Sequence, residues 1–486
     1  MPAMSKTGEI IILATTRRRM YFDVQGATLV TAQDTTDIEL MTMAGNIRDL
    51  TAEITALSDS FTKSLAEQQI AEPTFKSDSP VSYENLSTEL FLHRQKLLDK
   101  ITDLWYLVQG PSESIFNHVH TCVPDIMALN LMNHFNFWSA VPLDGSSSVK
   151  GIADHTRLPE EVVIRVLKHA TTLRLFAPEG DFDVTQQVSH SSRSAALAKS
   201  SGLRALVSTI IDDAGAPMLA MNRALELHSR GKPTLTKEIS ETAFALYQKG
   251  GCTGNYETSW DFIENDGEGE QKGWRQRNFV EFMRYIKDIF HLESTLAESF
   301  DWNALGDATI VDLGGSGGHD SFSLAQRFPS LNIIVEDLPH AESAFDQHCP
   351  DALKNRVSFR AHDFFNPQPV NADIFLIKLI LHDWPDEECV KILKALVPAL
   401  RPGAKVFFLD YVGHQQAAGG SVNTPRSIQQ MGTATDLRMM ALFNAEERPA
   451  EAWRNIFKAA HESFDVVRLE ANPMTFFVAI EAVWRG

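Results

Sequence analysis

The chain has 486 residues, of which 44% are hydrophobic and 22% are charged, and its formal net charge is −19. This composition is typical of a globular protein of two or three domains and excludes a collagen-like, coiled-coil or wholly disordered chain. The acidic excess repels phosphate backbones, so we expect no nucleic-acid partner.

Cysteine usage and hydropathy indicate the compartment. No apolar run approaches the roughly 18 residues that span a bilayer, and the apolar Ile10–Leu13 precedes Arg17–Arg19, the reverse of a secretory signal. The four cysteines form no CxxC pair, which argues for a reducing compartment and against a disulfide framework or a structural zinc site: Cys122, Cys252, Cys349 and Cys389. We therefore expect a soluble, cytoplasmic protein with no membrane partner and no metal.

The first 42 residues show no regular hydrophobic period, and we expect a disordered extension there. Arg17–Arg19 is interpreted as part of a solvated tail, since three residues are too few for a nuclear signal. Met41 and Met43 are alternative starts of the folded part.

Two amphipathic helices are expected next. Apolar residues recur at three- and four-residue spacing between Met43 and Gln69, which predicts the first helix. A polar loop over 72–82 separates it from a second helix over Tyr83–Gln109, which ends before Gly110. The residues of these helices show no spacing typical of a catalytic site. We therefore expect the helices to have a packing role, with a second subunit as a candidate partner.

Residues 119–190 are predicted to form a small helical unit that ends in a hairpin. Val162–Leu173 presents one apolar helix face, and short strands over 175–177 and 182–184 flank a turn at Pro178–Asp181. This pattern predicts a winged helix, a unit that often binds DNA. Dimerisation or a scaffold role is favoured over DNA binding, because the second helix offers only three basic side chains in an acidic chain: Arg165, Lys168 and Arg174.

Residues 203–300 are predicted to be helical around a polar loop at Asn265–Gly273, and the pattern changes after Asp307. Seven strand-like runs follow: Thr309–Leu313, Asn332–Glu336, Val357–Arg360, Asp373–Ile377, Lys405–Asp410, Phe464–Leu469 and Thr475–Ile480. Helices separate the first five, which predicts a parallel sheet with right-handed crossovers. The last two are too close for a helix between them and are expected to form an antiparallel hairpin. Residues 415–427 are expected to be a flexible loop above the sheet.

The strongest local signal is the glycine turn after the first strand, VDLGGSGGH at 311–319. Glycines there let a ligand approach the backbone, and ligands of open α/β sheets bind at the carboxyl ends of strands. A plain strand-to-helix turn is the alternative reading. Asp320 stands where a dinucleotide motif has its third glycine, which weakens a pyrophosphate interpretation.

The next two strand ends carry groups that suit a nucleoside. Asp337 follows the second strand about 20 residues after the glycine turn, where a carboxylate accepts hydrogen bonds from ribose hydroxyls. After the third strand, Asp363 and Phe364 offer an acceptor for an adenine amino group and a face for its ring. Together the three strand ends predict a nucleoside-containing cofactor.

His382 follows the apolar fourth strand directly and is the candidate general base. A structural histidine that caps the next helix is the alternative. Asp410, at the end of the fifth strand, and Glu447 are expected to converge on the imidazole from the same edge, as a carboxylate does when it orients a base.

The stretch from Val311 to Pro339, with LHDWPDEECVKIL and ALFNAEERP, resembles the plant and fungal small-molecule O-methyltransferases that use S-adenosylmethionine. The resemblance covers roughly residues 43–484. It implies an α/β fold: a seven-stranded Rossmann-like methyltransferase domain with a reversed last strand, preceded by a mainly helical winged-helix dimerisation domain. It also implies a homodimer that needs no metal and acts on a small molecule.

The resemblance divides the chain into 1–42, a disordered extension; 43–200, the dimerisation domain; 201–300, a helical connection that lines the substrate site; and 301–486, the cofactor-binding catalytic domain. It assigns cofactor contacts to six residues: Gly314 and Gly315 at the methionine part, Asp337 at the ribose, and Asp363, Phe364 and Lys378 at the adenine. It assigns catalysis to three: His382 as base, flanked by Asp410 and Glu447.

Three residues depart from the commoner pattern of the family. Ser316 replaces a glycine, Asp410 stands where plant members often carry Glu, and Pro449 stands where Thr is usual. None of them removes the base or the cofactor acid. An apolar substrate lining is expected from eight residues, with core packing as the default reading of each: Phe135, Phe137, Trp138, Met218, Met221, Met439, Met440 and Phe443.

The sequence thus predicts an O-methyltransferase that acts on a phenol, enol or hydroxypyridone of fungal secondary metabolism. Two alternatives stay open. The first is a pericyclase of the same family, which binds the cofactor but uses its charge and donors such as Lys378 to polarise a carbonyl. The second is a winged-helix regulator with a decayed enzyme domain, against which the complete set of site residues and the charge of −19 argue.

Overall fold

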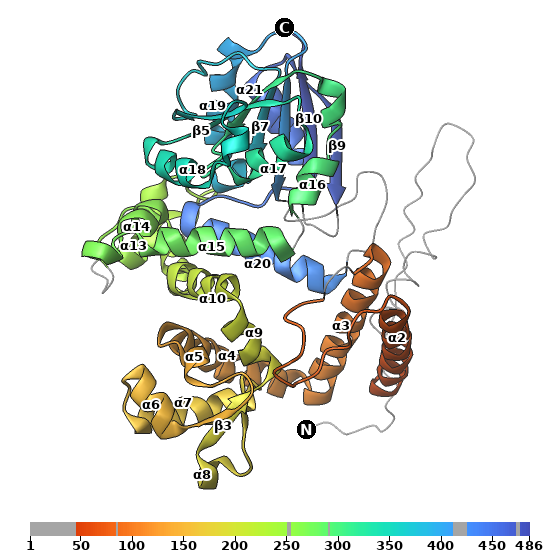
Figure 1. Cartoon of the computed structure of the whole chain (residues 1–486), viewed down its shortest axis with the longest axis vertical. Coiled ribbons are helices and arrows are strands. Elements are labelled where there is room, and N and C mark those ends of the chain that lie inside the picture. Colours follow the sequence, from red (N-terminus) through yellow and green to blue (C-terminus); the bar gives the residue numbers. More distant parts are fainter. Residues whose placement is uncertain (1–44, 84–85, 250–253, 290–291, 412–424, 473–476) are drawn as a thin grey trace, which may run out of the picture.

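The computed structural model describes residues 45–83, 86–249, 254–289, 292–411, 425–472 and 477–486. The predicted extension 1–42 lies outside them, as does most of the predicted loop 415–427, whose last residues begin a helix. An α/β unit with a large sheet stands at one end of the molecule, and helical parts extend below it in Figure 1. Among the helices of the described ranges, none is long and apolar enough to cross a membrane.

The first two helices form an antiparallel hairpin. Helix α2 (Ile47–Glu67) and helix α3 (Thr88–Gln109) begin at Asn46 and Ser87, whose side chains accept hydrogen bonds from the first-turn amides. Both predicted helices are confirmed, although α3 begins later than expected because Ser87 supplies its cap. Their contact buries Phe61, Leu65 and Leu90.

The next unit combines helices with a three-stranded antiparallel sheet of order β1-β3-β2. Its elements are α4 (Pro111–His134), α5 (Phe137–Ala140), β1 (Ser146–Ser148), α6 (Val149–Thr156), α7 (Glu160–Thr172), β2 (Phe176–Pro178), α8 (Phe182–Thr185) and β3 (Gln187–His190). The expected strand over 182–184 is wrong. Asp181 caps a helical turn there by accepting from the amide of Asp183, and the strand forms five residues later.

A helical region links this unit to the α/β domain. It contains α9 (Ser192–Lys199), α10 (Ser201–Ser208), the π-helical η1 (Thr209–Gly215), α11 (Ala216–Met218), α12 (Met221–His228), η2 (Ile239–Glu241), α13 (Ala243–Gln248), α14 (Ser259–Asn265), η3 (Gly269–Gln271), α15 (Trp274–Ile289), α16 (Leu292–Glu298) and η4 (Trp302–Leu305). A buried Arg275 joins its parts by pairing with both Asp213 and Asp266.

The large sheet has seven strands in the order β6-β5-β4-β7-β8-β10-β9. They are β4 (Thr309–Leu313), β5 (Asn332–Asp337), β6 (Val357–Ala361), β7 (Ile374–Lys378), β8 (Lys405–Tyr411), β9 (Phe464–Asn472) and β10 (Phe477–Trp484). The first five in sequence are parallel, and β10 runs antiparallel between β8 and β9. The predicted fold class, with its reversed last strand, is confirmed.

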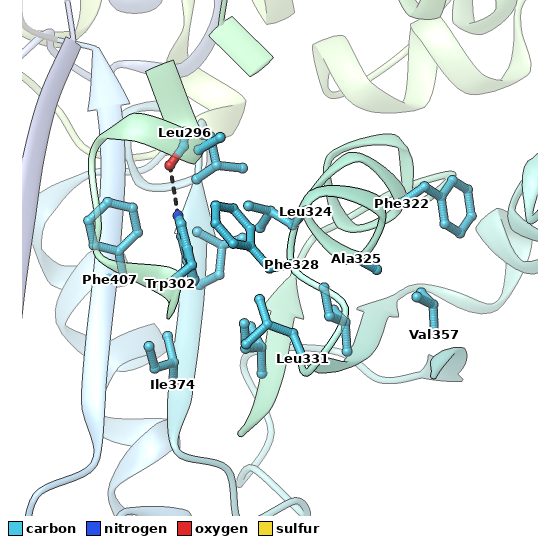
Figure 2. Packing of buried hydrophobic residues seen from close by; sticks show 14 of the residues in the cluster. Leu296, Trp302, Phe322, Leu324, Ala325, Phe328, Leu331, Val357, Ile374 and Phe407 are labelled. Carbon is cyan, nitrogen blue, oxygen red and sulfur yellow. Dashed lines mark hydrogen bonds between the residues drawn. The ribbon is translucent and has the colours of Figure 1, made fainter. Parts of the chain in front are cut away.

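Helices and short turns cover both faces of this sheet (Figure 1). They are α17 (His319–Arg327), η5 (Pro339–Ala341), α18 (Glu342–His348), η6 (Asp351–Leu353), η7 (Leu381–Asp383), α19 (Asp386–Leu396), η8 (Val397–Ala399) and α21 (Ala450–Ala460). Helix α20 (Arg426–Phe443) lies beyond the sheet, against α3, α11 and α13. Successive strand residues face opposite sides, so Phe407 joins the cluster of Trp302 and Phe328 in Figure 2, whereas Phe408 packs on Trp453. Two buried layers thus hold the carboxyl ends of the strands in place.

Candidate active site

The first two glycines of the turn after β4 have no room for a side chain. Gly314 has φ of +69°, and a Cβ there would lie 2.5 Å from Cδ1 of Ile380. A Cβ on Gly315 would lie 2.6 Å from Oδ2 of Asp312. Both glycine amides donate to the carbonyl of Glu336. Gly314 is therefore required both by its left-handed backbone and by close packing, and Gly315 by close packing alone.

Asp337 fixes this turn to the end of β5. Its Oδ2 accepts from the amide of Ser316 at 2.8 Å, and its Oδ1 accepts from the amide of Leu338 at 2.7 Å. The side chain is half-buried, and each carboxylate oxygen has a second lone pair. Asp337 therefore lies beside the glycine turn with acceptor capacity for a diol.

Phe364 brings the third strand end to the same place. A Cβ on Gly314 would lie 3.9 Å from the Phe364 ring, which also packs edge-on against Trp384. The exposed Asp363 accepts from the amide of Phe365 at 3.0 Å and so caps its own turn. As predicted, the three strand ends thus lie close together, with Gly314, Asp337 and Phe364 at the place where they meet.

Lys378 lies in a buried charge cluster. Its Nζ is 2.7 Å from Oδ1 of Asp320, in the first turn of α17, and Lys287 pairs with the other oxygen at 2.9 Å. Burial alone raises the pKa of Asp320, but the two ammonium groups hold it well below its usual range. Lys378 thus pairs with Asp320 at the start of α17.

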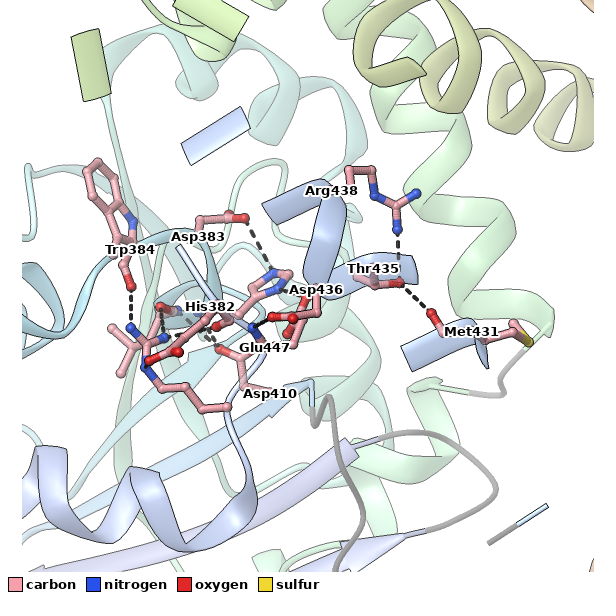
Figure 3. Close-up of polar contacts among 12 residues, drawn as sticks. His382, Asp383, Trp384, Asp410, Met431, Thr435, Asp436, Arg438 and Glu447 are labelled. Carbon is pink, nitrogen blue, oxygen red and sulfur yellow. Dashed lines mark hydrogen bonds and ion pairs between the residues drawn. The ribbon is translucent and has the colours of Figure 1, made fainter. Parts of the chain in front are cut away.

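His382 lies in η7, directly beyond β7, within a group of carboxylates (Figure 3). Its Nδ1 is 3.1 Å from Oε1 of Glu447, and its Nε2 is 3.6 Å from Oδ1 of Asp383. Burial lowers the pKa of His382, but Asp383, Asp410 and Glu447 together raise it well above the ordinary value. The imidazole therefore has a high proton affinity and one nitrogen held by a carboxylate.

Asp410 contributes in another way than expected. Its Oδ2 accepts from the backbone amides of Leu381 and His382, at 3.1 and 3.3 Å. The expected contact with the imidazole is therefore seen for Glu447, while Asp410 fixes the backbone of the same residue. Its negative charge also adds to the field that favours the imidazolium.

Arg448 clamps the loop that carries His382, a role that the sequence analysis missed. The side chain is 1% exposed, and it donates to the carbonyls of Leu381 and Trp384 and to Asp386. Its neighbour Pro449 is the N-cap residue of α21. The charged clamp thus spans the backbone on both sides of the imidazole.

Two further acidic residues near His382, Asp383 and Asp436, were not predicted from the sequence. Asp383 adjoins His382, and burial raises its pKa to about 6 against the effect of the imidazole, which lowers it. Asp436, on α20, accepts from the amide of Glu447 at 2.7 Å. The adjacency of Asp383 to His382 was a usable sequence signal, whereas no local pattern links Asp436 to Glu447.

The eight apolar candidates separate into groups. Phe137 and Trp138 belong to the core of the β1–β3 unit, so core packing is their role in this chain. Met439 and Phe443, on α20, pack with Phe244 and Phe262 of the helical connection, and Met218 and Met221 pack around Ala441. Phe135 is exposed. The apolar residues packed against α20 therefore come from the helical connection and not from the β1–β3 unit.

Comparison with known proteins places this chain in a family. A model of the O-methyltransferase domain matches residues 267–462. The O-methyltransferase lcsG of Purpureocillium lilacinum is 45% identical over 434 residues, covering 88% of this chain and 92% of that protein. The solved structure of LepI in complex with SAM shares the fold, with a TM-score of 0.64 at 19% identity, over 90% of this chain and all of that chain. So does a structure titled a pericyclic reaction enzyme, with a TM-score of 0.63 at 18% identity over the same shares.

Proposed function

The chain belongs to the O-methyltransferase family and is a methyltransferase that uses S-adenosylmethionine, and on that premise we propose that it methylates a hydroxyl group of a fungal-type secondary metabolite. The acceptor class is a phenol, an enol or a hydroxypyridone. The observation that carries the proposal is the imidazole of His382, bound at Nδ1 by the buried Glu447 at the carboxyl edge of the sheet.

The residues at the glycine turn fit the cofactor. Gly314 and Gly315 give a surface free of side chains, Asp337 offers acceptor capacity for ribose hydroxyls, and Asp363 and Phe364 suit an adenine. Lys378 pairs with Asp320 at the start of α17 and so helps to fix the helix that follows the glycine turn. When bound, the cofactor supplies a methyl group activated by a sulfonium. The chain's own task is to hold donor and acceptor in near-attack geometry.

The proton of the acceptor hydroxyl goes to Nε2 of His382. Glu447 accepts a hydrogen bond from Nδ1–H, which selects the tautomer with its lone pair on Nε2. As Nε2 takes the proton, the imidazolium is stabilised by Glu447, Asp383 and Asp410. Arg448 and Asp410 hold the backbone of the loop, so the ring does not need to reorient during the reaction.

A pericyclic reaction is the second candidate, and the shared fold with the pericyclic reaction enzyme supports keeping it. That reading needs a free donor to polarise a carbonyl, with Lys378 as the first choice. The Lys378 side chain is only 4% exposed and already pairs with Asp320 at 2.7 Å, so it is not a free donor, which favours methyl transfer.

One experiment separates the two. Candidate pathway intermediates are incubated with S-adenosylmethionine, and both S-adenosylhomocysteine and product mass are measured. A gain of one methyl with stoichiometric S-adenosylhomocysteine supports the proposal. An unchanged mass or a loss of water, without S-adenosylhomocysteine, overturns it in favour of the pericyclic reading.

The same proposal includes a homodimer. Helices α3 and α4 leave large apolar side chains exposed over a continuous stretch: Trp105, Tyr106, Val108, Ile115, Phe116, Val119 and Val123. A patch of this kind is typical of a protein–protein interface. Residues 43–200 are therefore proposed as the dimerisation domain.

A further inference from the structure

The helix α20 begins without a cap of its own. Its N-cap residue is Pro425, whose side chain has no acceptor. Helices leave their first amides unpaired unless an outside group accepts from them. Here Asp99, on α3, does so: its Oδ2 accepts from the amide of Arg426 at 2.7 Å, and its Oδ1 from that of Ser427 at 2.8 Å. The cap therefore comes from a helix 327 residues earlier in the chain.

The rest of the junction reinforces this contact. The Arg426 guanidinium donates to the carbonyl of Asp99 at 3.0 Å and pairs with Asp103 at 2.6 Å. The Ser427 hydroxyl donates to the carbonyl of Gln95 at 3.4 Å. A carboxylate at a helix N-terminus is also favoured by the helix dipole. The N-terminal hairpin is thus joined to α20 by directional bonds and not by apolar packing alone.

Farther along, α20 reaches the catalytic loop. Asp436 accepts from the amide of Glu447 at 2.7 Å, and Glu447 in turn binds Nδ1 of His382. Of the three carboxylates that face the imidazole, Asp383 comes from η7 and Asp410 from β8, whereas the backbone amide of Glu447 is bound by Asp436 on α20. The position of α20 therefore acts on one identifiable partner of the imidazole.

We propose that Asp99 is a positioning residue, which caps α20 from the N-terminal hairpin and thereby keeps Glu447 in place against His382. The inference rests on the proposed role of His382 as base. It adds Asp99, which lies outside the catalytic domain, to the residues that position this base. Docking of α3 then sets the geometry of the base.

The test uses the full chain and does not need the acceptor. Asp99→Ala is compared with Glu53→Gln, which breaks the ion pair to Lys100 in the same hairpin and leaves α20 untouched. Hydrogen–deuterium exchange is followed for α20, and the His382 imidazole is titrated by NMR, with its signal assigned through His382→Gln. In Asp99→Ala, exchange in the first turns of α20 should speed up about fivefold to thirtyfold, as expected for a lost cap.

The titration midpoint of His382 separates a positioning role of Asp99 from a purely structural one, because a purely structural role would not change this midpoint. Loosening Glu447 removes one group that raises the His382 pKa, so the midpoint should fall in Asp99→Ala and stay in Glu53→Gln. Arg448 lies next to Glu447, but its contacts are to backbone carbonyls and Asp386, and they remain.

Rescue completes the test. Pro425 has φ of −50° and ψ of 139°, so an aspartate there can cap α20 locally. Pro425→Asp in the Asp99→Ala background should restore both slow exchange and the original midpoint. The inference would be overturned if Asp99→Ala changed neither the exchange of α20 nor the midpoint of His382. It would also be overturned if exchange increased equally in α2, α3 and α20 and Pro425→Asp did not restore it. Because neither readout measures methyl transfer, failure of the proposed reaction would be seen separately.

Discussion

Nδ1 of His382 lies 3.1 Å from Oε1 of Glu447, and the Glu447 side chain is completely shielded from solvent. A buried carboxylate so close to an imidazole stabilises the protonated ring and leaves Nε2, which lies 3.6 Å from Oδ1 of Asp383, as the nitrogen that Glu447 does not occupy. In the proposed reaction, the pair fixes both the nitrogen that takes the proton and the affinity of the imidazole for it.

Removal of the base tests this assignment. His382→Ala should lower turnover by about 10²–10⁴-fold, the usual contribution of a general base, while the affinity for S-adenosylmethionine stays near wild type. Steady-state kinetics and calorimetric titration measure the two quantities. Lys378→Ala serves as the comparison. An equal loss of turnover in both variants would favour the pericyclic reading, and full methyl transfer in His382→Ala would remove the base assignment.

The pH dependence follows from the carboxylates around the ring. His382 accepts a proton only when neutral, and its pKa is raised well above 6.5 by Asp383, Asp410 and Glu447 against the effect of burial. Turnover should therefore increase as pH rises through this elevated value. Glu447→Gln removes one of the raising groups, so its pH profile should have a lower midpoint and a lower plateau. A midpoint that does not move would contradict the contact.

Cofactor affinity tests the role of Asp337, the last residue of β5. Asp337→Ala should weaken S-adenosylmethionine binding at least tenfold, since losing a charge-assisted hydrogen bond costs on the order of 1.5–3 kcal/mol. The amide of Ser316 loses its acceptor at the same time. Asp351→Ala, at an exposed ion pair with Lys354, is the control for charge alone. Equal affinities in the two folded variants would place the cofactor elsewhere.

Gly314 should tolerate no side chain. In Gly314→Ala the new Cβ meets Ile380 at 2.5 Å with φ at +69°, whereas Gly403→Ala at φ +90° meets nothing within 4 Å. Both substitutions strain the backbone, but only the first adds overpacking of about 1–3 kcal/mol. Thermal unfolding should show a larger loss of stability for Gly314→Ala, accompanied by weaker cofactor binding. Matching losses would mean that the turn has spare room.

The proposed dimer predicts a sedimenting mass of about twice 54.2 kDa at micromolar concentration. Phe116→Asp places a charge in the exposed apolar face of α4 and should yield a monomer. Val184→Asp, on the exposed α8 of the β1–β3 unit, should leave the dimer intact. A wild-type monomer throughout that concentration range would refute the assignment of residues 43–200.

Much of the catalytic domain could be predicted from the sequence because its strands are short apolar runs ended by turn residues. β4 was predicted with its observed bounds, and β5, β6 and β7 within one residue at each end. The mistaken strand over 182–184 shows the limit of such patterns. There the side chain of Asp181 offers the backbone a local hydrogen bond, which favours a helical turn over an extended conformation.

The site could be predicted only in part. Asp337 and His382 follow strand ends, where parallel topology brings residues to one edge. The contacts of Asp410 with backbone amides, of Arg448 with backbone carbonyls and of Asp436 with Glu447 are set by tertiary packing. They leave no periodic signature, because each joins a side chain to the main chain of a distant segment.

The Asp99–α20 junction also matters for protein engineering. A chimera that joins residues 301–486 to the N-terminal part of another protein would inherit a helix that starts at Pro425 with its first two amides unpaired, unless the donor supplies a matching carboxylate. Recombination between relatives should therefore carry α3 and α20 together, or place an aspartate or serine at position 425 so that the catalytic half brings its own cap.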